Sequence, residues 1–120
     1  GDDRVTIFNT VGRAAYAIEA GGGDDDIRIN VLTSPLTAFG GDGDDRIVAS
    51  TDAVLVSVPL TLDGGAGDDF LQGGALGDTL IGGAGDDTVL GGPGDDTIFW
   101  AAGDGSDRID GEAGFDTLHV

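Results

Sequence analysis

The chain is short, strongly acidic and free of cysteine. Its 120 residues suit one domain, and 23 acidic residues against five basic ones give a formal charge of −18. This charge excludes the basic face that nucleic-acid phosphates require. The absence of Cys excludes disulfides and thiolate metal sites, and no apolar run approaches the roughly 18–20 residues of a membrane-spanning helix.

An Asp followed two residues later by an aliphatic residue recurs nine times along the chain. These Asp residues are Asp3, Asp25, Asp45, Asp69, Asp78, Asp87, Asp96, Asp107 and Asp116. Acidity of this size is typical of disordered segments, but a disordered segment would not keep its 39% hydrophobic residues in a fixed register. The pattern predicts a stacked repeat with a carboxylate at every turn. The charge conflict is resolved if these carboxylates face bound cations.

Residues 1–63 contain the longer units of this repeat. Asp3, Asp25, Asp45 and Asp69 are separated by 22, 20 and 24 residues, each close to one complete coil of two strands. We expect each of these coils to have one Gly/Asp turn and one plain turn. The plain turns are predicted near Asn9–Arg13, Thr33–Pro35 and Ala49–Asp52.

Residues 64–120 contain regular nonapeptides, and the two parts are expected to form one continuous solenoid. From Asp69 onward the Asp residues are 9, 9, 9, 11 and 9 positions apart. Because side chains alternate across a strand, apolar residues at fixed distances before the Asp of each coil are predicted to face inward. They are Ile18, Ala38, Leu62, Leu80 and Trp100 at seven residues, and Tyr16, Leu36, Leu60 and Ile98 at nine. The spacing of eleven is interpreted as a longer strand in which Ile98 and Trp100 both face inward.

The most regular copies are Gly64–Gln72, Gly82–Leu90 and Gly91–Phe99. They resemble the RTX nonapeptide, Gly-Gly-x-Gly-x-Asp-x-U-x, in which U is a large aliphatic residue. The resemblance is strong over residues 64–118 and looser over residues 1–63. It implies an all-β, right-handed parallel β-roll whose Gly/Asp turns bind Ca²⁺ between adjacent turns of a stack.

The spacing divides the Gly/Asp turns into two stacks. One stack would contain Asp3, Asp25, Asp45, Asp69, Asp87 and Asp107, and the other Asp78, Asp96 and Asp116. By the resemblance, the ligands are these carboxylates and the carbonyls of the turn glycines. The glycines are Gly23, Gly41, Gly43, Gly65, Gly67, Gly83, Gly85, Gly92, Gly94, Gly103, Gly105 and Gly114. Filling every gap would take up to seven Ca²⁺ ions and would reduce the formal charge from −18 to −4.

Some turns depart from the repeat. Ala20 and Ala102 replace the first glycine, Glu112 replaces the second, and Leu76 replaces the third glycine before Asp78. If that third position needs a positive φ, Leu76 would strain the turn and weaken its calcium site.

Other interpretations of the polar residues stay open. The Asp series could form Asx turns without metal. The neighbouring carboxylates are interpreted mainly as solvated charges beside the sites; they are Asp2, Asp24, Asp44, Asp68, Asp86 and Asp95. Arg4, Arg46 and Arg108 are expected to point outward, where they soften the acidic field or form a ligand patch. His119 is predicted to lie on the surface.

The outward residues Phe70 and Phe99 are expected to contact a neighbouring domain. No Ser has a partnered base, so no catalytic residue is predicted and we expect no enzymatic activity. The resemblance implies a module that folds on binding extracellular Ca²⁺, within a larger secreted protein exported by a type I route. The alternative is an adhesin or carbohydrate-binding β-roll. Expected partners are calcium and the rest of the parent chain, with end-to-end self-association as a further option.

Overall fold

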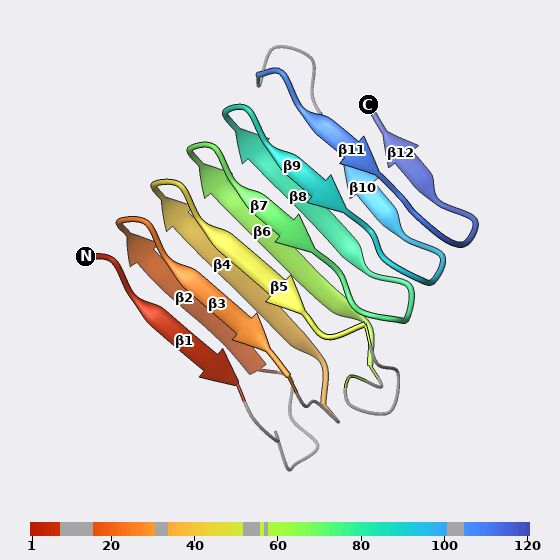
Figure 1. Cartoon of the computed structure of the whole chain (residues 1–120), viewed down its shortest axis with the longest axis horizontal. Helices are drawn as coiled ribbons and strands as arrows, with labels where there is room; N and C mark the ends of the chain where they lie inside the picture. Colours follow the sequence, from red (N-terminus) through yellow and green to blue (C-terminus); the bar gives the residue numbers. More distant parts are fainter. Residues whose placement is uncertain (8–15, 31–33, 52–55, 57, 101–104) are drawn as a thin grey trace.

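The computed structural model describes residues 1–7, 16–30, 34–51, 56, 58–100 and 105–120, and in these ranges it is built from short strands (Figure 1). One sheet contains β1 (Arg4–Ile7), β3 (Asp26–Ile29), β5 (Arg46–Ala49), β7 (Phe70–Gln72), β9 (Thr88–Leu90) and β11 (Arg108–Asp110). The other contains β2 (Tyr16–Gly22), β4 (Leu36–Asp42), β6 (Leu60–Ala66), β8 (Thr79–Ala84), β10 (Thr97–Phe99) and β12 (Thr117–His119). The described residues include no helix that could cross a membrane.

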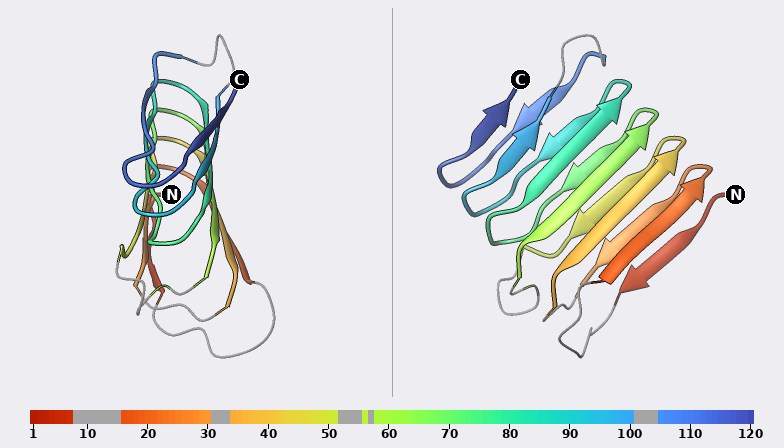
Figure 2. Two further views of the ribbon diagram at one scale, coloured as in Figure 1. Left: turned by 90° about the vertical axis from the view of Figure 1, so that its right-hand side faces the viewer. Right: turned by 180° about the vertical axis from the view of Figure 1, so that it is seen from behind.

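Successive strands alternate between the two sheets, and all pairings between named strands are parallel. The chain therefore winds as a flattened coil with one strand of each sheet per turn, and Figure 2 shows the two sheets facing each other. Both sheets run without interruption through the longer and the shorter units. The predicted all-β parallel solenoid is confirmed.

The core lies between the sheets and consists of columns of aliphatic side chains. In the first sheet Ile27, Ile47, Leu71 and Val89 occupy one column, and each is at most 2% exposed. Full burial of such a side chain stabilises the fold by about 1.5–3 kcal/mol. Because each rung packs only on its neighbours, this stabilisation accumulates along one dimension.

The second sheet confirms most of the predicted inward positions. Those buried at 2% exposure or less are Ala38, Leu62, Leu80, Leu36, Leu60 and Ile98. Tyr16 has the same register as Leu36 but is 38% exposed, because β2 is the outermost described strand of its sheet.

The interpretation of the eleven-residue spacing is wrong. Ile98 pairs with Leu80, so β10 has the same register as β8 and gains no residue. Trp100 lies after the end of β10 and is half-buried. The two additional residues therefore do not lengthen β10, which ends at Phe99.

The plain turns are only partly within the described structure. Asn9–Arg13, Thr33 and Asp52 lie outside the described residues. Ala49, predicted to begin a turn, is instead the last residue of β5 and is 2% exposed. Its small apolar side chain continues the inward alternation, which the turn prediction overlooked.

Candidate metal centre

Every Asp of the repeat immediately precedes a strand. The residues Asp3, Asp25, Asp45, Asp69, Asp87 and Asp107 come before the strands of the first sheet. The residues Asp78, Asp96 and Asp116 come before β8, β10 and β12 of the second sheet. The strand register therefore brings these Asp residues together in two stacks, in the same order as the spacing indicated.

Each stacked Asp is held by a hydrogen bond from the neighbouring rung. The N–H of Asp25 donates to Oδ1 of Asp45 at 2.9 Å, and the N–H of Asp45 donates to Oδ1 of Asp69 at 2.7 Å. The same bond joins Asp3 to Asp25, Asp69 to Asp87, Asp87 to Asp107, Asp78 to Asp96 and Asp96 to Asp116. One carboxylate oxygen of each acceptor is thus used to fix the position of the side chain. We call this series the inner ladder.

The second carboxylate oxygen is buried and has no such donor. Asp25, Asp45, Asp69 and Asp96 are at most 2% exposed, and the Oδ2 atom of each has no hydrogen-bond partner in the described structure. A buried polar atom without a partner costs about 1–3 kcal/mol, and more when it is charged. Four such atoms at equivalent positions therefore suit a cation as their partner.

The pKa values show how unfavourable this arrangement is for bare carboxylates. Burial raises the pKa of Asp69 to about 7 and that of Asp78 to about 6, and it also raises the pKa values of Asp45 and Asp96. Neighbouring carboxylates of the same ladder raise them further, whereas the bonds from backbone N–H groups oppose the shift. Since desolvation and repulsion both disfavour the charge, a proton or a cation must compensate.

The predicted turn glycines have backbone conformations that other residues rarely adopt. All of them within the described residues have a positive φ, for example 108° at Gly65 and 134° at Gly67, while Gly103 lies outside the described residues. A Cβ at either position would also collide with a carbonyl of the preceding rung, Gly41 O and Gly43 O respectively. Glycine is therefore required both by conformation and by the close stacking of the turns.

The first glycine of the hexad was not predicted as a site residue, but it borders the buried oxygen. A Cβ at Gly64 would lie 2.7 Å from both Asp69 Cγ and Gly82 O, and closer still to Asp69 Oδ2. Gly40 and Gly91 have equivalent surroundings, next to the carboxylate of their own turn and a carbonyl of the next rung. The missing side chain leaves a space lined by anionic and carbonyl oxygens, which are the ligands that Ca²⁺ prefers. The recurrence of Gly at this position was the available signal.

The Asp78 turn has a different conformation. The prediction of strain at Leu76 is wrong, because the one non-glycine residue with a positive φ in the described structure is Glu112, at 70°. Instead, Oδ2 of Asp78 accepts the N–H of Gly74 at 2.5 Å, and Oδ1 accepts the N–H of Leu60 at 2.8 Å. Both oxygens of this carboxylate are thus satisfied by backbone donors.

The neighbouring exposed carboxylates form an outer ladder that was not predicted. Oδ1 of Asp24 accepts the N–H of Asp44 at 3.0 Å, and Oδ1 of Asp44 accepts the N–H of Asp68 at 2.9 Å. The carboxylates of Asp2, Asp68, Asp86 and Asp95 accept equivalent bonds from backbone N–H groups of the next rung. These bonds run from each rung to the one before it, opposite to the inner ladder. The outer carboxylates therefore hold successive turns in register while they remain in solvent.

The donor set is dominated by backbone oxygens. Within the part of the chain that the structure describes, no three His, Cys, Asp or Glu side chains meet in one place. The turns of Asp45, Asp69 and Asp96 instead each offer a buried carboxylate oxygen beside a backbone carbonyl of the next rung. Such a set fits a hard cation with flexible coordination, and it does not fit zinc, which favours nitrogen and sulfur ligands.

Comparison with known families agrees with this chemistry. A family model described as the RTX calcium-binding nonapeptide repeat matches in four copies, at residues 37–55, 61–75, 72–99 and 101–119. These matches cover more than half of the chain. The chain belongs to the RTX calcium-binding repeat family. No match was found among curated proteins or among solved structures. The repeats of this RTX chain are thus calcium-binding repeats on a parallel β-roll.

Proposed function

We propose that this RTX chain is a folding module that assembles when its turn stacks bind extracellular Ca²⁺. The observation that carries the proposal is the row of buried Oδ2 atoms at Asp25, Asp45, Asp69 and Asp96. Without a cation these carboxylates repel one another and are poorly solvated, so the metal-free roll is unstable. A bound Ca²⁺ neutralises the charge and supplies the missing partner, and its binding free energy then becomes folding free energy.

The ligands in each gap are proposed to be the inner-ladder carboxylate and the carbonyls of the stacked turn glycines. Three gaps combine an Oδ2 atom without a partner and a first glycine beside a carbonyl of the next rung. They lie between the turns of Asp45, Asp69 and Asp96 and the turn of the next rung in each stack. We propose that these three sites bind Ca²⁺ most tightly. The Asp78 gap is proposed to bind weakly, because backbone donors already occupy both of its carboxylate oxygens.

The cellular role follows from the dependence on calcium. At low intracellular Ca²⁺ the chain would stay unfolded, and at extracellular Ca²⁺ it would fold. This favours a secreted protein that leaves the cell unfolded, as in type I export, with the β-roll serving a larger parent chain. Residues 1–63 and 64–120 are proposed to act as one solenoid, because both sheets continue through both parts. The proposed role requires no catalytic residue.

Calorimetric titration of the EDTA-treated chain with Ca²⁺ tests this proposal. The comparison is between Asp69→Asn and Asp68→Asn, which remove one charge each from adjacent positions. Asp69 is buried and its Oδ2 faces the gap, whereas Asp68 is exposed and belongs to the outer ladder. We expect Asp69→Asn to remove a tight site and Asp68→Asn to keep the ion count. Equal ion counts for both variants and the parent chain would contradict the assignment.

A further inference from the structure

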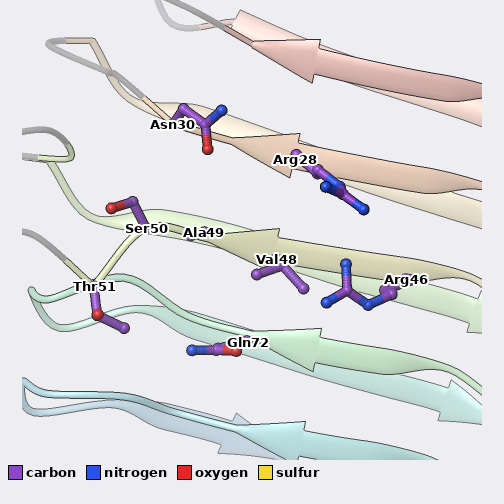
Figure 3. Close-up of a pocket in the computed structure, with 8 residues that line it drawn as sticks. All are labelled: Arg28, Asn30, Arg46, Val48, Ala49, Ser50, Thr51 and Gln72. Carbon is purple, nitrogen blue, oxygen red and sulfur yellow. The ribbon is translucent and has the colours of Figure 1, made fainter.

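A pocket of about 400 Å³ lies on the outer face of the first sheet, on the side away from the core. Figure 3 shows its lining, which comes from β3 and the residue after it, β5 and the segment after it, and β7. Val48 lies in the middle, Arg28 and Arg46 lie at one end, and Asn30 and Thr51 lie at the other. Gln72 lies across from Arg28, because Arg28, Val48 and Gln72 are register partners on three neighbouring strands.

The cationic end of this pocket is an exception in a chain of charge −18. Three of the five arginines surround the single carboxylate of Asp26. The distances to its oxygens are 3.7 Å from Arg4 Nε, 3.0 Å from Arg28 Nη2 and 3.5 Å from Arg46 Nη1. One negative charge among three positive ones leaves a net local charge of +2. Two of these guanidinium groups, those of Arg28 and Arg46, line the pocket.

The two arginines are held in place but are not saturated by Asp26. Arg28 donates from Nε and Nη2 to Asp26, and the guanidinium of Arg46 lies 5.6 Å from the centre of the Phe70 ring. Each guanidinium has five N–H donors in a fixed planar fork, more than one carboxylate can accept. Their side chains remain 51% and 49% exposed, so a second anion can approach them.

The uncharged residues of the pocket indicate which other groups a ligand would carry. Val48 offers an apolar floor of a few carbon atoms, which suits the C–H face of a small ring or chain. Asn30, Thr51 and Gln72 carry amide and hydroxyl groups, which can both donate to and accept from hydroxyl groups. We propose that this pocket binds a small organic carboxylate that also carries hydroxyl groups, with its carboxylate on Arg28 and Arg46. The site is separate from the calcium turns and requires only that the roll is folded.

The test is an NMR titration of the ¹⁵N-labelled full chain at saturating Ca²⁺, after circular dichroism has established that each sample is folded. The probe is glucuronate, and glucose is the matched neutral sugar. We expect glucuronate, but not glucose, to shift the amide signals of Arg28, Val48 and Gln72 in a saturable way. A failure to fold would count against the calcium proposal, whereas a folded chain without these shifts would overturn the pocket.

Charge-matched variants separate a fitted site from general attraction. Arg46→Gln should weaken glucuronate binding about tenfold, since it removes a charge-assisted bond. Arg108→Gln is the control, because Arg108 is exposed in the same outward row of the first sheet and is not part of the pocket. Equal losses in both variants would overturn the site, and so would equal binding of glucose. Binding of inorganic phosphate in place of glucuronate would overturn the assignment to carboxylates.

Discussion

Adding a single methyl group beside the proposed calcium ligands of one turn should weaken calcium-dependent folding. Gly64 is the residue to change, because its φ lies outside the positive range and alanine therefore meets no backbone strain there. The new Cβ would lie 2.7 Å from Gly82 O and nearer still to Asp69 Oδ2. These are the two kinds of oxygen that Ca²⁺ would contact at roughly 2.3–2.6 Å. The methyl group would therefore displace the oxygens that are proposed to hold the ion.

The size of the effect can be worked out from the contacts. Forcing a methyl group into a closely packed site costs about 1–3 kcal/mol, so Gly64→Ala should lower the folding equilibrium constant by a factor of about 5 to about 150. The matched control is Gly74→Ala, whose Cβ would have its nearest contacts at 3.5, 3.5 and 3.6 Å, with no positive φ. This variant should be neutral or gain about 0.4–1 kcal/mol, because alanine restricts the unfolded chain.

The assay is a Ca²⁺ titration of both variants by circular dichroism at pH 7.5, combined with calorimetric counting of bound ions. Gly64→Ala should require more Ca²⁺ for half-folding and bind fewer ions than the parent chain. Gly74→Ala should keep the ion count. A Gly64→Ala variant with the parent midpoint and ion count would refute a calcium site at this turn, and so would similar changes in the same direction in both variants.

Three further predictions use the same geometry. Ala20 occupies the register position of Gly40 and Gly64 on neighbouring strands. Ala20→Gly should therefore open a further calcium site beside Asp25 and increase the number of ions counted by calorimetry. An unchanged count would contradict this. Gly65→Ala should cost at least about 1–3 kcal/mol, because its φ is 108° and Gly41 O blocks the added methyl group; a parent-like midpoint would exclude this constraint. Burial raises the pKa of Asp69 to about 7, so the metal-free roll binds protons that the unfolded chain releases. Its stability should therefore fall as pH rises from about 4 to 7, and Ca²⁺ affinity should rise over the same range; circular dichroism in EDTA showing less β-structure at pH 5 than at pH 8 would refute this.

The resemblance to the RTX nonapeptide implied the parallel β-roll, and the regular spacing was enough to predict the two stacks of turns. Asp and aliphatic positions repeat at the rung length, and neighbouring rungs are nearly identical, so register follows from counting. The spacing did not predict the strand register correctly where two extra residues interrupt the repeat. The sequence between Asp96 and Asp107 does not say whether two extra residues lengthen the strand or follow it. The pairing of Ile98 with Leu80 decides this, since it keeps the column of buried side chains continuous.

The use of individual oxygens could not be predicted from the sequence. Asp68 and Asp69 are identical residues in adjacent positions, but one carboxylate is exposed in the outer ladder and the other is buried in the inner ladder. The difference arises from the turn geometry, which directs adjacent side chains to opposite sides. The contacts of the arginine side chains likewise could not be predicted from the sequence. Arg4 and Arg46 were expected on one face, but the contribution of Arg28 depends on register across β1, β3 and β5.

The central claim is that cation binding in the turn stacks drives folding of the roll. Far-UV circular dichroism of the chain in EDTA, followed by titration with Ca²⁺ and separately with Mg²⁺, tests it most directly. Mg²⁺ is the appropriate control because it demands nearly ideal octahedral geometry and gives up its water reluctantly. We predict a cooperative transition from coil to β-structure with Ca²⁺ and none at the same concentration of Mg²⁺. A chain that already has its full β-structure in EDTA at pH 7.5 would contradict the claim.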